Sequence, residues 1–229
     1  MAIFSQPLRW DADLLSKYDL AGPRYTSYPT APQFHNNFSD QDFYEAVARS
    51  NHDAKPLSLY FHIPFCESLC FYCGCNKVVT PNKTRAEPYL QYLAQEIAAR
   101  SALFDAHRVV TQLHWGGGTP TFISDEEMSE LMKVTREYFT LCDDDTGEYS
   151  VEIHPGKVSS NTMGHLRNLG FNRVSMGVQD FDPEVQRAVN RYNSRQEVDS
   201  LMQDLRQQNY HSISMDLIYG LPKQTLRSV

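Results

Sequence analysis

The chain has 229 residues, of which 41% are hydrophobic and 21% charged, and a formal net charge of −7. This length and composition are typical of a soluble globular protein with one large domain or two small ones. The acidic balance excludes a general nucleic-acid binder, which needs a basic surface against the phosphates. No apolar run approaches the roughly 20 residues of a membrane-spanning helix, and the first residues lack a signal-peptide pattern. We therefore expect a cytoplasmic monomer that binds neither nucleic acid nor membrane.

Residues 1–56 are predicted to form an irregular N-terminal arm with some helix, and residues 57–229 a domain in which strands alternate with helices. This alternation indicates parallel βα units with right-handed crossovers, as in a doubly wound sheet or part of a barrel. The strands are expected at 57–63, 109–115, 148–154, 172–178 and 212–219, and the helices at 87–101, 124–139, 159–170, 182–190 and 195–209.

Several predicted helices carry boundary signals. Ser124 and Glu127 have the spacing of a capping box. Asp182 suits an N-cap, with Pro183 at the first helical position. Gly170 suits the position just after a helix end.

Every predicted strand alternates apolar and polar residues. A parallel strand covered on both faces is usually apolar throughout, and a closed eight-stranded barrel fills its lumen with branched side chains. The pattern therefore predicts an incomplete or wider barrel with a polar lumen for a polar ligand. A half-solvated antiparallel sheet would also alternate, but the helix-length connections disfavour it. The polar faces carry Ser58, Tyr60 and His62, then Gln112 and His114, then Ser150, Glu152 and His154, then Arg173, Ser175, Gly177 and Gln179, and finally Ser212, Ser214 and Asp216.

Four cysteines crowd the segment that follows the first predicted strand. Cys66, Cys70 and Cys73 form a C-x3-C-x2-C pattern, Cys75 follows, and Cys142 stands alone. We call residues 66–75 the cysteine loop. Cytoplasmic thiols stay reduced, which disfavours disulfides, and the second C-x2-C pair of many zinc sites is absent. The crowding favours an iron–sulfur cluster, with either four ligands or three and one open iron.

These motifs resemble those of the radical S-adenosylmethionine (SAM) superfamily, in which Tyr72 matches the aromatic residue before the third cysteine. More specifically, the chain resembles the oxygen-independent coproporphyrinogen III oxidases (dehydrogenases) of haem biosynthesis. The resemblance implies an α/β fold, with five strands of a six-stranded incomplete parallel (β/α) barrel after an N-terminal extension. The stretches that carry it are GPRYTSYPTA (22–31), LSLYFHIPFC (57–66), CFYCGCNK (70–77), LHWGGGTPT (113–121), RVSMGVQDF (173–181) and DLIYGLPKQT (216–225).

The resemblance assigns the cofactors to residues of this chain. It implies that Cys66, Cys70 and Cys73 bind a [4Fe–4S] cluster whose open iron chelates SAM. Cys75 is either a small buried thiol or an auxiliary residue near the cluster. Two SAM molecules are expected, and their binding residues are Tyr60, Tyr72, Gly116, Gly117, Gly118, Thr119, Glu152, Gln179, Arg191 and Asp216.

Some of these residues have simpler interpretations. Glu152, Gln179 and Asp216 could belong to an internal ion-pair network, for example with Arg173. Arg191 could be a solvated surface residue. The glycines of the run 116–118 could form only a tight turn.

The implied reaction is the oxidative decarboxylation of two propionates of coproporphyrinogen III to vinyl groups, which gives protoporphyrinogen IX through a 5′-deoxyadenosyl radical. Arg24, in the arm, is a candidate to pair with a propionate, because a guanidinium matches a carboxylate bidentately. An electron donor of unknown identity must reduce the cluster. The alternatives are a haem chaperone of the same superfamily and a non-catalytic zinc or iron–sulfur module.

The chain ends soon after its fifth predicted strand. The resemblance implies that family members continue through another strand, helices and a C-terminal domain. We therefore expect a truncated barrel that binds the cluster and some SAM but turns over little or no substrate.

Overall fold

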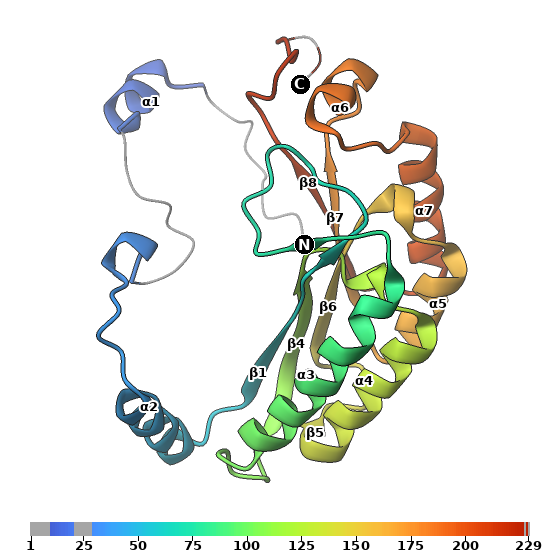
Figure 1. Ribbon diagram of the computed structural model, residues 1–229. Helices are drawn as coiled ribbons and strands as arrows, with labels where there is room; N and C mark the ends of the chain where they lie inside the picture. Colours follow the sequence, from blue (N-terminus) through green and yellow to red (C-terminus); the bar gives the residue numbers. More distant parts are fainter. Residues whose placement is uncertain (1–9, 21–28, 227, 229) are drawn as a thin grey trace. The chain divides into compact units, whose positions relative to one another are not determined.

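Figure 1 shows a computed structural model of the chain, which describes residues 10–20, 29–226 and 228. The contacts divide the chain into two units, residues 1–46 and 47–229. The first unit contains α1 (Ala12–Tyr18), η1 (Ala31–Gln33) and the beginning of α2 (Asp40–Asp53). None of the helices in the described ranges is long and apolar enough to cross a membrane.

The second unit is built on a six-stranded sheet in which every strand pair is parallel. Its long strands lie side by side in chain order, whereas a doubly wound sheet reverses its order at a switch point. The structure therefore excludes the doubly wound and antiparallel alternatives, and the predicted strand boundaries are correct to within two residues. The strands are β1 (Leu57–Ile63), β4 (Val109–Gly117), β6 (Glu148–Ile153), β7 (Arg173–Gln179) and β8 (Ser212–Leu217), and the short β5 (Thr140–Leu141) pairs with β4.

Four long helices cover one face of this sheet (Figure 1). They follow the strands in turn, because right-handed crossovers in one direction place every helix on the same side. A fifth, α6 (Pro183–Val189), lies beyond the carboxyl end of β7. The four covering helices are α3 (Ala86–Ser101), α4 (Asp125–Tyr138), α5 (Ser160–Asn168) and α7 (Arg195–Gln207).

The predicted helix boundaries have the expected caps. Ser124 and Glu127 form a reciprocal capping box at α4. The side chain of Asp182 accepts from the backbone of Glu184 at the start of α6. Gly170 follows α5 with a φ of +108°, which suits the residue after a helix end.

The core lies between the sheet and its helices. Leu57, Phe61 and Ile63 of β1 are buried, and Trp115 of β4 packs edge-on against Phe171 with ring centroids 4.7 Å apart. The polar residues of the same strands remain half-buried or exposed on the opposite face. The predicted alternation is therefore confirmed in β1, β4, β6 and β7, and it leaves the polar face available for a ligand. β8 departs from it, because none of its residues is buried and Leu217, predicted on the apolar face, is 61% exposed.

A small second sheet was not predicted. β2 (Phe65–Cys66) and β3 (Val78–Val79) form a parallel pair that brings together the two ends of the segment containing the cysteine loop. Short 3-10 helices lie near the same end of the main sheet: η2 (Lys83–Arg85), η3 (Pro120–Phe122) and η4 (Pro155–Lys157).

Tyr149 should make a measurable contribution to stability. Its buried hydroxyl donates to the carbonyl of Val110 at 2.9 Å and accepts from the amide of Cys142 at 2.7 Å. Burial raises the pKa of this phenol to about 12, so it stays protonated at neutral pH. Tyr149→Phe removes the partner of two backbone groups and should lower the free energy of unfolding by about 1–3 kcal/mol.

Urea unfolding of the metal-free protein measures this loss. Tyr138→Phe, at an exposed side chain, serves as the control and should change stability little. Equal stabilities for the two variants would contradict the prediction.

Candidate active site

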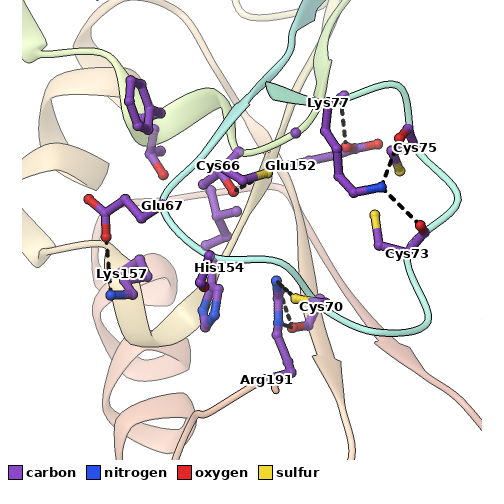
Figure 2. A pocket seen from close by; sticks show the side chains of 18 of the residues that line it. Cys66, Glu67, Cys70, Cys73, Cys75, Lys77, Glu152, His154, Lys157 and Arg191 are labelled. Carbon is purple, nitrogen blue, oxygen red and sulfur yellow. Dashed lines mark hydrogen bonds and ion pairs between the residues drawn. The ribbon is translucent and has the colours of Figure 1, made fainter. Parts of the chain in front are cut away.

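The site lies where the parallel strands end. The carboxyl ends of β4, β6, β7 and β8 meet the cysteine loop around one cavity (Figure 2). Most of the predicted site residues line it: Cys66, Cys70, Tyr72, Cys73, Cys75, Gly117, Gly118, Thr119, Glu152, Gln179, Arg191 and Asp216.

The cysteine loop is fixed at its base by backbone hydrogen bonds. The amide of Val78 donates to the carbonyl of Pro64, and the amide of Thr80 donates to the carbonyl of Cys66, both at 2.8 Å. Lys77 donates from its ammonium group to the carbonyls of Cys73 and Cys75, at 3.0 and 3.2 Å (Figure 2). These hydrogen bonds hold the loop without involving its thiols.

The three predicted ligand thiols are half-buried and face the same cavity. Burial raises the pKa of the Cys66 thiol. The Thr119 hydroxyl, whose oxygen lies 3.7 Å from the sulfur, partly offsets this rise. Within the described ranges, no three His, Cys, Asp or Glu side chains are grouped to bind one metal ion. A cluster makes a different demand, because each thiolate binds a different iron of the cluster. A donor set of three soft thiolates beside an open cavity fits such a cluster.

Cys75 differs from the other three. Its residue is exposed, so the interpretation as a small buried thiol is wrong. It lines the same cavity, near Glu152 and Cys73. An auxiliary role for this thiol stays a prediction.

The glycine run is required by close backbone contacts. Gly117 has a φ of +115°, and its amide donates to Glu152 at 3.1 Å. The amide of Gly118 donates to the carbonyl of Ile63 at 2.9 Å, and a Cβ on Gly118 would lie 2.6 Å from the carbonyl oxygen of Pro64. The glycines therefore make a tight turn, as one interpretation had it. Gly117 and Gly118 also line the cavity, whereas Gly116 and Tyr60, two further predicted site residues, do not.

Glu152 is a carboxylate of the cavity that two groups of β4 hold in place. One of its oxygens accepts from Gly117, and the other accepts from Nε2 of His114 at 3.2 Å. Burial alone would raise the pKa of Glu152, but these hydrogen bonds outweigh it and lower the pKa below the usual value. The carboxylate is thus ionised and oriented at neutral pH.

His114 is a site residue that the sequence analysis placed on the polar face but assigned no role. Its Nδ1 pairs with the Ser150 hydroxyl, and its ring stacks on Tyr60 with centroids 5.6 Å apart. The strand register aligns these residues, because Tyr60 lies opposite His114 and His114 opposite Ser150. Parallel pairing thus assembles a polar layer across β1, β4 and β6.

The β7 side of the cavity is shaped by one residue with a positive φ and by one half-buried arginine. Gln179 has a φ of +72°, a conformation uncommon outside glycine, at a bulge in the pairing with β8. Arg191 is half-buried: its guanidinium donates to the carbonyl of Gly177, and Nη1 lies 3.8 Å from the sulfur of Cys70. The interpretation of Arg191 as a solvated surface residue is therefore wrong.

The suggested ion-pair network with Arg173 is also wrong. Arg173 pairs with Glu148 at 2.6 Å, at the other end of the strand from Glu152. Asp216 accepts from the Ser175 hydroxyl at 3.0 Å instead.

His154 is a second residue of the cavity to which the sequence analysis assigned no role. It is buried beside the cavity, and its Nδ1 accepts from the amide of Gly156 at 3.2 Å. Burial lowers its pKa to about 3, and the nearby charges of Arg191 and Lys157 act in the same direction. The ring is therefore neutral at physiological pH.

The arm motif cannot be placed in this site. Arg24 and most of GPRYTSYPTA lie outside the described residues. The propionate pairing of Arg24 stays a prediction.

Comparison with known proteins identifies the class. Residues 60–229 match the model of the radical SAM superfamily. The chain therefore belongs to that superfamily, which uses a [4Fe–4S] cluster and SAM. The predicted partial-barrel fold and cofactors are confirmed at this level.

The relatives narrow the assignment to the oxygen-independent coproporphyrinogen III oxidase family. The enzyme of that name from Pseudomonas aeruginosa is 54% identical over 218 residues, which cover 95% of this chain and 47% of that protein. The one from Mannheimia haemolytica is 49% identical over 146 residues, 64% of this chain and 97% of that protein.

A solved structure agrees. Coproporphyrinogen III oxidase from Escherichia coli, described as a radical SAM enzyme, superposes with a TM-score of 0.86 at 48% identity. The match covers 97% of this chain and 49% of that one. This chain thus spans about half the length of the Pseudomonas and Escherichia proteins.

Gly116 should be sensitive to the smallest substitution. A Cβ there would lie 2.8 Å from Nε2 of His114, 3.0 Å from the Tyr60 ring and 3.1 Å from the Glu152 carboxyl carbon. Gly116→Ala should displace this polar layer at a cost of about 1–3 kcal/mol, the usual range for overpacking. If SAM contacts the layer, its affinity should fall by about 10- to 100-fold.

Anaerobic titration of the reconstituted protein with SAM measures this affinity. Gly164→Ala is the matched control, because no atom outside its own helix lies within 3.4 Å of the added Cβ. Unchanged SAM affinity in Gly116→Ala would contradict a role for the layer.

His154 should make the stability of the metal-free protein depend on pH. The unfolded chain takes up a proton at His154 below about pH 6.5, whereas the folded chain resists protonation down to about pH 3. His154 therefore leaves the free energy of unfolding unchanged above about pH 6.5. As the pH falls from there toward about 3, protonation of the unfolded chain lowers this free energy by up to about 1.4 kcal/mol per pH unit.

His154→Asn tests this directly. The Asn oxygen can still accept from Gly156, but the side chain no longer titrates. The unfolding free energy of the variant should fall less steeply with pH between about pH 6 and pH 4. Parallel curves for the two proteins would contradict the prediction.

Proposed function

We propose that this chain forms the cofactor-binding part of a coproporphyrinogen III oxidase of the radical SAM type. The main support for the proposal is that the cysteine loop and the polar carboxyl ends of four parallel strands line the same cavity. The 54% and 49% identities to named members of the family support the same assignment.

The chain's own residues would divide the work of holding the cofactors. Cys66, Cys70 and Cys73 would bind the cluster, and Cys75 would stay unligated so that one iron remains open. When bound, the cluster and SAM supply the 5′-deoxyadenosyl radical that removes a hydrogen atom from the substrate. The protein contributes positions, charges and the exclusion of water.

Glu152 and the glycine run would orient SAM. A carboxylate that is ionised and fixed by two donors is suited to bind ribose hydroxyls or an ammonium group. Tyr60 and Tyr72 would lie beside the cofactor, and Gln179, Arg191 and Asp216 would bind from the β7 and β8 side.

The proposed substrate is coproporphyrinogen III. At each of two propionates, a hydrogen atom would pass to the 5′-deoxyadenosyl radical, carbon dioxide would leave, and a separate one-electron acceptor would take the remaining electron, so that a vinyl group forms. Arg24 would pair with a propionate carboxylate. We further propose a cytoplasmic monomer that receives electrons from a separate donor.

Two alternatives remain distinct in their chemistry. A haem chaperone of the same superfamily would bind haem rather than porphyrinogen. A zinc module would contain zinc without acid-labile sulfide. Haem titration and metal and sulfide analysis separate these from the proposed enzyme.

Cysteine variants test the cluster assignment. After anaerobic reconstitution, Cys66→Ser, Cys70→Ser and Cys73→Ser should each lose most cluster iron and sulfide, because each removes a ligand. Cys75→Ser should keep the cluster, as should the control Cys142→Ser. Loss of the cluster in Cys75→Ser would instead indicate four ligands and a closed cluster.

Electron paramagnetic resonance then tests the open iron. Adding SAM to the reduced wild-type cluster should change its spectrum, because SAM would become a ligand. SAM cleavage that increases with coproporphyrinogen III would support the substrate. An unchanged spectrum after SAM is added, or a protein that contains zinc but no sulfide, would contradict the proposed function.

A further inference from the structure

The cysteine loop is also fixed from a part of the chain far away in sequence. The amide of Phe71 donates to the carbonyl of Val189 at 3.0 Å, and the side-chain amide of Asn190 donates to the carbonyl of Leu69 at 2.7 Å. Arg191, next along the chain, contacts the sulfur of Cys70 (Figure 2). Three consecutive residues, 189–191, thus contact three consecutive residues of the loop, 69–71; we call residues 189–191 the α6 clamp.

The end of α6 has the geometry that makes these contacts possible. Asn190 adopts the left-handed conformation, with φ 53° and ψ 46°. The amide of Arg191 donates to the carbonyl of Gln186 at 3.0 Å, and that of Asn190 to Arg187 at 3.4 Å, which is a Schellman motif. The carbonyl of Val189 has no partner within the helix, so the amide of Phe71 satisfies it.

The clamp is itself firmly attached to the domain. Gln186 is buried, and its side-chain amide donates to the carbonyls of Asp180 and Asn193, at 2.8 and 2.6 Å. Val185 and Val189 are buried in a small apolar cluster against which Tyr72 of the cysteine loop packs. Residues 189–191 can therefore impose their position on the loop.

We propose that Asn190 is a positioning residue for the cluster, and that its amide holds residues 69–71 so that the Cys70 thiol faces the cavity beside Arg191. The proposal rests on the proposed cluster, and it adds a residue outside the cysteine motif. Without the Asn190 amide, the carbonyl of Leu69 loses this partner. The loop is then attached to the end of α6 through one backbone hydrogen bond, the weak Arg191 contact and the packing of Tyr72. Substitution of Asn190 should therefore increase the rate at which the cluster is lost more than it lowers the stability of the fold.

Two substitutions isolate the amide. Asn190→Gly keeps the left-handed backbone at little cost but removes the side chain. Asn190→Asp keeps the size and tolerates the same backbone, but an ionised carboxylate cannot donate to a carbonyl. Both variants preserve the Schellman motif, so α6 should still end as it does.

Asn209 offers a matched control. It follows α7 with a φ of 59°, and the amide of Tyr210 donates to the carbonyl of Leu205 at 3.0 Å, as Arg191 does to Gln186 at the end of α6. It precedes β8, at the opposite end of the sheet from the cysteine loop. Asn209→Gly therefore changes the same kind of helix end without touching the site.

The measurement is the rate at which an iron chelator removes the cluster from the reconstituted proteins under anaerobic conditions. Both Asn190 variants should lose the cluster about tenfold faster than wild type, the usual effect of removing a residue that supports metal ligands. Asn209→Gly should lose it at the wild-type rate. Urea unfolding of the metal-free proteins should give Asn190→Gly and Asn209→Gly similar midpoints.

The outcomes separate the two proposals. If both Asn190 variants lose the cluster at the wild-type rate, the positioning role is overturned, while the proposed binding of a cluster by this loop still stands. Equally fast loss in Asn209→Gly would also overturn it, because the effect would then be general instability. If the wild-type chain takes up no cluster at all, the proposed function fails and the role of Asn190 fails with it.

Discussion

The parallel register of β1, β4 and β6 is the constraint on which the site depends. Because the strands run in one direction, their carboxyl ends meet at one edge of the sheet. Because one face of each strand packs on helices, the other face is left for polar side chains. The register sets Tyr60, His114 and Ser150 opposite one another, so residues from three distant segments form one layer.

A carboxylate at the edge of this layer would be costly without partners. His114 and the amide of Gly117 supply them to Glu152, and both belong to the neighbouring strand. The missing side chain of Gly116 is equally important, since a Cβ there would occupy the space in which His114, Tyr60 and Glu152 meet. The glycine run therefore serves the polar layer as well as the turn.

The cysteine loop depends on two separate attachments. The β2–β3 pair fixes its base, and the end of α6 fixes its middle. The second attachment involves Arg191, which contacts both the β7 backbone and Cys70. The loop and the β7 side of the cavity are thus linked through one short segment. We therefore expect a displacement of the loop to displace the β7 side of the cavity as well.

The sequence by itself determined the strand and helix order, the polar and apolar faces, the caps and the cysteine loop, because these follow from local spacing and from periods of two or 3.6 residues. It also placed Glu152, Gln179 and Asp216 on the polar face. It did not determine that His114 binds Glu152, that Arg191 is half-buried against Cys70, or that Cys75 is exposed.

Only the tertiary structure decided those features, because they depend on strand register and on contacts between segments up to 121 residues apart. Asn190 illustrates the difference. An Asn at a helix end signals a left-handed turn in the sequence. Which carbonyl its side chain reaches depends on where the cysteine loop lies after the sheet has formed, and no local pattern encodes that.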